Sequence, residues 1–235
     1  MKSEFTFSSP ESQLGKALDF GYRVMTCNDY YEKKSAGLKK IIVNRVDVDL
    51  SVKKAERFAE IFENLGVKAT FFIRLHAPEY NFFSFENFRI IDRFINAGHE
   101  IGLHTEVLDQ ANIWKKSPAD CLSKDIEILQ KTFDININGC ASHNGVTGIN
   151  NLDFFKSNHL TEFGLKYEAY DGTEEFGLFY DSLYVSDSRS QWKCYYNGRL
   201  IDGDNRSLAE HIDTLPPKIY LLTHPDNFFV NHIYE

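Results

Sequence analysis

Two aspartates stand at the end of a strongly apolar stretch of this sequence. Residues 41–43 are Ile-Ile-Val, and Asp47 and Asp49 follow with one residue between them. Because side chains alternate along a strand, both carboxylates are expected on the same face. Two neighbouring carboxylates repel each other, and one would be driven to its protonated form unless a cation lies beside them. The pair therefore favours a bound metal ion.

Later apolar stretches of the chain also end in ionisable side chains. These residues are Arg74, His76, His104, Glu106, His143, Asp187 and His224. In a barrel of parallel strands the carboxyl ends of the strands converge on one mouth, where active sites lie. We therefore expect these side chains to meet.

The residue types indicate which chemistry such a mouth would perform. An aspartate and two histidines would give a metal ion three protein ligands and leave positions for water. Water bound to such an ion becomes acidic enough to act as a nucleophile near neutral pH. The second aspartate is then free to serve as a general base. The pattern predicts metal-dependent hydrolysis.

Strands and helices alternate along the sequence, and they must position these residues. The predicted strands are 41–49, 67–75, 99–106, 137–145, 166–171, 182–188 and 218–225. The predicted helices are 51–66, 84–98, 117–133, 151–158 and 207–215. This alternation is typical of an α/β fold with a parallel sheet. Repeated over this length, it predicts a distorted (β/α) barrel of about seven parallel strands.

Helix-start and helix-stop residues support these boundaries. Ser117 is a good N-cap, Pro118 suits the first helical position, and Gly66 is a typical C-terminal stop. The sequence has no linker-like, low-complexity or repeated segment. We therefore expect one domain over residues 1–235, with residues 1–40 forming an N-terminal helix and a lead-in packed on the barrel.

Composition excludes several classes of protein. The net charge of −8 and the absence of a basic run argue against a nucleic-acid-binding protein. No stretch approaches the length of an apolar membrane span, and the first residues lack the apolar core of a signal peptide. The four cysteines are scattered without a C-x-x-C pair, which is typical of reduced thiols in a cytoplasmic protein.

Six motifs in this order resemble those of the polysaccharide deacetylase superfamily, the nodulation-factor deacetylase-like carbohydrate esterases. They are RVDVD (45–49), GVKATFFIR (66–74), GHEIGLHTE (98–106), SHNG (142–145), SDSRSQW (186–192) and LLTHP (221–225). The sequence is most similar to a divergent branch with an R-H-D-V-D first motif, which is found in surface-polysaccharide gene clusters. The segment 21–31 also resembles the lead-in of that branch.

The resemblance implies a distorted (β/α) barrel and metal-dependent removal of acetyl groups from sugars. By this likeness Asp47 is the catalytic base, and Asp49 is the metal-binding carboxylate. His104 corresponds to the first metal histidine, and His224 to the residue that protonates the departing amine or alcohol.

One position departs from the family pattern. The second motif usually carries a second histidine, but this chain has Leu108 there. The third metal ligand must therefore come from another residue. His143 is our first choice and Glu106 our second.

Several of the remaining residues have two interpretations. Arg74 and His76 are either substrate contacts or members of structural ion pairs. Glu106, if it is not a ligand, lies near the substrate or supports a neighbour. Asp187 and Trp192 either orient a catalytic group and line a sugar pocket or are packing residues. His99 is interpreted as structural.

The sequence thus predicts a cytoplasmic deacetylase that acts on a sugar precursor, nucleotide- or lipid-linked, in surface-polysaccharide or O-antigen biosynthesis. It would use one divalent metal ion, with zinc the first choice and cobalt, nickel, manganese and iron compatible. Two alternatives remain open. One is an amidohydrolase acting on a non-sugar amide, and the other is a non-catalytic sugar-binding relative that has lost its metal.

Overall fold

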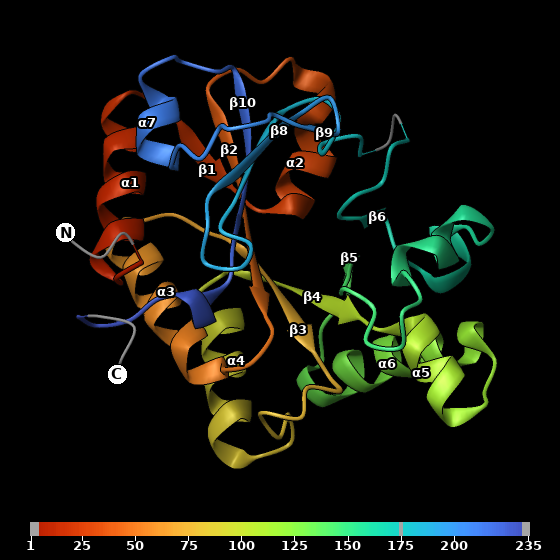
Figure 1. Cartoon of the computed structure of the whole chain (residues 1–235). Coiled ribbons are helices and arrows are strands. Elements are labelled where there is room, and N and C mark those ends of the chain that lie inside the picture. Colours follow the sequence, from red (N-terminus) through yellow and green to blue (C-terminus); the bar gives the residue numbers. More distant parts are fainter. Residues whose placement is uncertain (1–4, 174–175, 232–235) are drawn as a thin grey trace.

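The computed structural model describes residues 5–173 and 176–231, so the first four residues of the predicted lead-in lie outside the described residues. Within this part, ten strands form one sheet in the order β6-β5-β4-β3-β2-β10-β7-β8-β9, with β1 beside β2 (Figure 1). The strands are β1 (Arg23–Met25), β2 (Ile41–Val48), β3 (Thr70–Arg74), β4 (Glu100–Thr105), β5 (Gly139–Ser142), β6 (Tyr167–Glu168), β7 (Leu183–Ser186), β8 (Lys193–Tyr196), β9 (Arg199–Leu200) and β10 (Lys218–Thr223).

The sheet is parallel from β6 to β7, and only β7-β8-β9 pair in antiparallel fashion. The predicted α/β fold with a mainly parallel sheet is therefore confirmed. The hydrogen-bonded path ends at β6 and β9 instead of closing, as expected of a distorted barrel. β1 pairs with the first half of β2, and β3 pairs with its second half.

Helices surround this sheet and most of them cover its outer face, whereas Cys27 and Tyr30 of the second helix pack with the interior residues (Figure 1). The helices are α1 (Ser8–Asp19), α2 (Cys27–Lys33), α3 (Val52–Asn64), α4 (Phe85–Asn96), α5 (Val107–Trp114), α6 (Pro118–Phe133) and α7 (Leu208–Ile212). The side chains of Ser51, Ser84 and Ser117 accept hydrogen bonds from the backbone three residues later and so cap α3, α4 and α6. The predicted cap at Ser117 is thus confirmed.

Some elements differ from the prediction. The segment predicted as helix 151–158 forms a short 3-10 helix over Asn151–Lys156, and the helix predicted over 207–215 is confined to α7. Helix α5 was not among the predicted elements. That helix ends at Trp114, and its C-cap Lys115 adopts a left-handed conformation usually given to glycine, so no stop signal marks the end.

The two faces of the sheet bury different sets of residues. Along β2, Ile42, Val46 and Val48 pack under the helices, whereas Ile41 and Val43 face the interior. Much of this interior is aromatic, and its buried rings include Tyr30, Phe72, Tyr167, Phe176, Tyr184 and Tyr220. By alternation, the polar residues further along β2 continue on the interior face.

Strand register brings the carboxyl ends of five strands to the same edge of the sheet. Arg74 at the end of β3 lies opposite His104 in β4, and Thr105 lies opposite Ser142 in β5. On the other side of β2, Thr223 of β10 lies opposite Val46. The residues that directly follow these strands therefore share one region.

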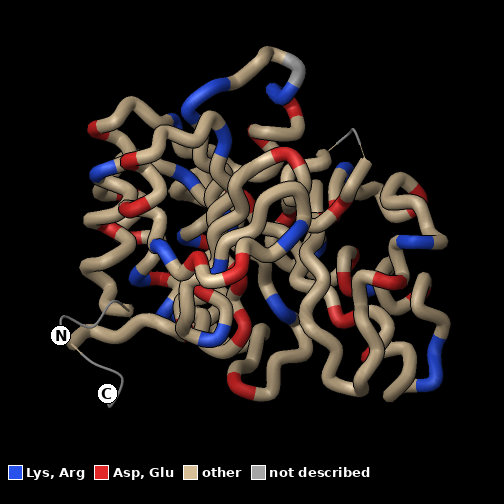
Figure 2. Tube along the Cα trace, turned by 45° about the horizontal axis from the view of Figure 1, so that its top comes forward, with Lys and Arg blue, Asp and Glu red and all other residues tan. Residues whose placement is uncertain are grey.

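The charged positions show no segregation along the described chain. Figure 2 shows lysine and arginine positions interspersed with aspartate and glutamate positions. None of the helices described is long and apolar enough to cross a bilayer.

Candidate active site

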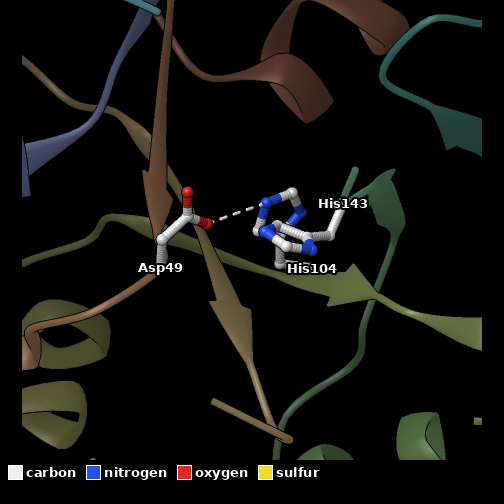
Figure 3. A group of neighbouring side chains, drawn as sticks. All are labelled: Asp49, His104 and His143. Atoms are coloured by element: carbon white, nitrogen blue, oxygen red, sulfur yellow. Dashed lines mark ion pairs between the residues drawn. The ribbon is translucent and has the colours of Figure 1, made fainter. Parts of the chain in front are cut away.

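The structure brings together the three residues first predicted as metal ligands. Asp49 follows β2, His104 lies in β4, and His143 follows β5. One ligand atom from each lies within 4.8 Å of the others. The two imidazole rings are 5.1 Å apart and nearly perpendicular, at 89° (Figure 3). This arrangement could hold a metal ion.

The contact between His104 and Asp49 favours a cation at this position. The Nδ1 atom of His104 lies 2.8 Å from the carbonyl oxygen of Ala141, which can only accept, so Nδ1 carries the proton. In the neutral ring, Nε2 then presents a lone pair to Asp49 Oδ1 at 3.1 Å. That oxygen is buried and lacks a hydrogen-bond partner. A divalent ion would satisfy both atoms, and oxygen and nitrogen donors suit zinc and similar metals.

The carboxylates around His104 also favour a positive charge at this position. Burial lowers the pKa of His104, but Asp47 and Asp49 outweigh it and raise this pKa. Burial conversely raises the pKa of Asp49, while the neighbouring histidines lower it. This part of the site therefore attracts positive charge, either a proton or a metal ion.

Glu106 lies behind His143 and not among the grouped ligand atoms. His143 Nδ1 is 3.4 Å from Glu106 Oε1, and that oxygen also accepts a hydrogen bond of 2.8 Å from Arg74. Burial raises the pKa of Glu106, but His143 and Arg74 reverse the effect and bring it to about 2. An ionised carboxylate behind an imidazole fixes the orientation of the ring. The geometry favours His143 over Glu106 as the third ligand.

Asp47 lies beside the group and is held by Arg45. Arg45 Nε and Nη2 donate to the two carboxylate oxygens of Asp47 at 2.8 and 2.7 Å, and both side chains are buried. The guanidinium lies 4.5 Å from the centre of the Tyr170 ring. Burial raises the pKa of Asp47, but Arg45 and His104 bring it below its usual value. Asp47 therefore remains ionised and oriented.

Arg45 was not among the residues predicted from the sequence to have a function. The signal was its position two residues before Asp47, since the alternation that pairs Asp47 with Asp49 also places Arg45 on the same face.

His224 and Asp187 form a second pair at the opposite side of the site. His224 Nδ1 lies 2.6 Å from Asp187 Oδ1, and the backbone N–H of His224 donates to Oδ2 at 2.8 Å. The Nε2 atom is 4.0 Å from Asp49 Oδ2. Burial lowers the pKa of His224, but Asp187, Asp47 and Asp49 raise it to about 9. His224 can therefore donate a proton. The buried Asp187 orients its ring and raises its pKa.

Two adjoining cavities of about 280 and 590 Å³ open on these residues and share Asp49, His143 and His224. Their combined size is that of a small-molecule site. Aromatic rings contribute much of the wall, and these are Tyr170, Phe179, Tyr180, Tyr184 and Tyr195.

The other predicted substrate contacts are placed differently. Arg74 lines the larger cavity. In the described part of the chain, neither His76 nor Trp192 lines the two cavities. His76 instead lies 2.9 Å from Asp125, and Trp192, which is 3% exposed, stacks on Phe5 in the outer core. His76 is therefore placed as a member of a structural ion pair, and Trp192 as a packing residue.

Asp226 was missed by the sequence analysis. It lines the larger cavity and accepts a hydrogen bond of 2.9 Å from the backbone N–H of Leu50. Burial, with a smaller effect of Asp49, raises its pKa to about 6. Its position two residues after His224 was the available signal.

No protein-family model matches the chain, and no curated protein sequence matches it. Two solved structures are similar in fold at low sequence identity. One is a mutant of a CE4 family pseudoenzyme with restored enzymatic activity, at 16% identity and a TM-score of 0.47 over 80% of this chain. The other is the Streptococcus pyogenes deacetylase PplD in complex with acetate, at 19% identity and a TM-score of 0.43 over 56% of this chain. The present chain spans 57% and 59% of the length of these two chains.

Proposed function

We propose that this protein is a metal-dependent deacetylase that removes an acetyl group from a sugar precursor. One observation carries the proposal. The Asp49–His104–His143 group lies between an ionised carboxylate, Asp47, and a histidine poised to donate a proton, His224. A hydrolase needs these parts around one cavity.

The side chains divide the reaction between them. A bound divalent ion would supply Lewis acidity and an activated water. Asp47, fixed by Arg45, accepts the proton of the attacking water. His224 Nε2 donates a proton to the departing amine or alcohol, and Asp187 holds the ring so that Nε2 faces the cavity.

The substrate class is supported by the cavity and by the motifs. Flat aromatic rings beside polar groups suit a sugar ring, which has apolar faces and hydroxyl edges. The R-H-D-V-D-like motif supports a precursor in surface-polysaccharide or O-antigen biosynthesis. A nucleotide- or lipid-linked sugar in the cytoplasm is the corresponding substrate, and zinc is the proposed ion.

Acetate release from acetylated sugars tests this function. The protein loaded with zinc, cobalt or manganese is expected to release acetate from N- or O-acetylated sugar precursors. His224→Gln removes the proposed proton donor and is expected to lower kcat by about 10²–10⁴-fold without loss of the metal. Turnover of simple acetanilides but not of acetylated sugars would instead support an amidohydrolase with a non-sugar substrate.

The absence of a histidine at Leu108 favours one rival, a sugar-binding relative without activity. The position of His143 argues against it, because this residue offers a third ligand atom near Asp49 and His104. Sugar binding without metal uptake or acetate release would establish the rival.

A further inference from the structure

A second group of metal-ligand side chains lies apart from the cavities. It consists of Cys194 in β8, His211 in α7, and Asp204 in the segment between β9 and α7. One ligand atom from each lies within 4.8 Å of the others. Cys194 and His211 are 0% and 1% exposed. A buried thiol and a buried imidazole therefore meet the carboxylate of a partly buried residue.

The atoms converge on the Nε2 atom of His211. This nitrogen lies 2.9 Å from Cys194 Sγ and 3.7 Å from Asp204 Oδ1. The carbonyl oxygen of Arg206 lies 3.5 Å from the same sulfur. Sulfur, nitrogen and one carboxylate oxygen thus supply three donors of the kinds that zinc binds, and the Arg206 carbonyl lies beside the sulfur.

The geometry argues against a nucleophilic cysteine. In a Cys–His–Asp triad the carboxylate holds the imidazole nitrogen that faces away from the thiol. Here Asp204 approaches the same nitrogen, Nε2, that faces Cys194. Burial and the nearby Asp204 raise the pKa of Cys194 to about 12, so the free thiol is not activated.

We propose that Cys194, Asp204 and His211 bind a structural zinc ion or a similar thiophilic divalent ion. A thiolate and an imidazole are ligands that zinc prefers, and here both are buried. Binding releases the thiol proton, and the ion compensates the buried thiolate. Arg206 donates to both oxygens of Asp204, at 2.9 and 2.7 Å, and so orients the carboxylate.

The position gives the ion a structural role. The bound ion would join β8, the 201–207 segment and α7. Both β8 and α7 are short elements. Cys194 is the strand partner of Val185 in β7, and β7 leads directly to Asp187. The ion would therefore fasten the part of the sheet that positions Asp187 and His224.

Cobalt distinguishes this site from the one at Asp49. A thiolate ligand gives bound cobalt a near-ultraviolet charge-transfer band, whereas the Asp49–His104–His143 set contains no sulfur. The full-length chain is stripped of metal with a chelator and titrated with cobalt. The band is expected in the wild type and in Asp49→Ala, and it is expected to be absent in Cys194→Ser. Cys121→Ser, which removes another buried thiol, is the matched control and keeps the band.

Three outcomes would overturn the proposal. The first is a wild type that shows no thiolate band in excess cobalt, which would leave only a hydrogen bond between Cys194 and His211. The second is a band that persists in Cys194→Ser. If Cys194→Ser does not fold, the cobalt affinity of Asp204→Asn tests the proposal instead. Loss of a ligand is expected to weaken cobalt binding by about tenfold or more, and unchanged affinity is the third contradicting outcome.

Discussion

The buried pair of Arg45 and Asp47 constrains the site at the scale of single residues. Both side chains are removed from water, and two parallel hydrogen bonds compensate their charges. The loss of one partner of such a pair leaves an uncompensated charge in the interior. The pair therefore orients Asp47 and also makes the fold depend on Arg45.

Arg45→Met tests this dependence. The variant is expected to lower the free energy of unfolding by about 3–5 kcal/mol, because it leaves the Asp47 carboxylate buried and unpaired. The double variant Arg45→Met with Asp47→Asn is expected to recover part of this loss, since it removes the charge as well. Urea unfolding of the three proteins measures both effects. A double variant that is less stable than Arg45→Met would contradict the argument.

Asp187 is predicted to act through His224. Asp187→Asn keeps the shape but removes the charge that holds Nδ1 in its protonated form. We expect kcat for deacetylation to fall by about 10²–10⁴-fold, while KM and metal content stay close to wild type. Steady-state kinetics and elemental analysis check this. A change in KM alone would assign Asp187 to substrate binding.

At the scale of elements, a helix or strand could be predicted where its own residues carried a cap or a regular apolar spacing. Serine caps and apolar spacing marked α3, α4 and α6 correctly. β1 and the β8–β9 hairpin carried no comparable signal, because short elements gain their stability from the sheet beside them. The N-cap of α2, Thr26, was a signal of the same kind that the prediction overlooked. Gly139 shows the same limit, since only the fold reveals that β5 passes against the ring of Tyr167.

Gly139→Ala is predicted to destabilise the protein. The added Cβ would overlap the Tyr167 ring, which stacks on Phe176 and donates a hydrogen bond to Glu100. Overpacking of this kind costs about 1–3 kcal/mol. Gly15→Ala in α1 is the control, because nothing lies within 4 Å of its added Cβ and alanine favours helices. Thermal unfolding is expected to separate the two variants, and an equal effect would argue against the close approach.

At the scale of the whole molecule, strand register assembles the site from residues distant in sequence. The ionisable ends of strands predicted the meeting of Asp49, His104 and His143, because parallel strands bring their carboxyl ends together. The same pattern failed to place His76. That side chain instead contacts Asp125 in α6. This contact depends on how α6 packs on the sheet, which the residues around His76 do not indicate.

The fold also predicts a loss of stability in acid. His99 accepts a hydrogen bond at Nδ1 from the Ala69 backbone, and burial, with Lys68 and Arg93, lowers its pKa to about 4. The unfolded chain takes up this proton below about pH 6.5, whereas the folded chain does not until about pH 4. Stability is therefore lost as the pH falls through this window, by about 3 kcal/mol for this residue.

His99→Asn isolates this contribution. The variant keeps an acceptor for the Ala69 N–H but has no titrating ring. Urea unfolding at pH 7 and pH 4 is expected to show a smaller loss of stability in the variant than in the wild type. An identical loss in both proteins would mean that His99 is protonated within the fold.

The central claim is that Asp49, His104 and His143 hold a divalent metal ion. Elemental analysis of the wild type, Asp49→Ala and His143→Ala after incubation with zinc tests it most directly. Both variants are expected to carry about one equivalent less metal than the wild type, whatever is bound at Cys194. Equal metal content in all three proteins would contradict the claim. If only Asp49→Ala lost its metal, Glu106 would replace His143 as the proposed third ligand.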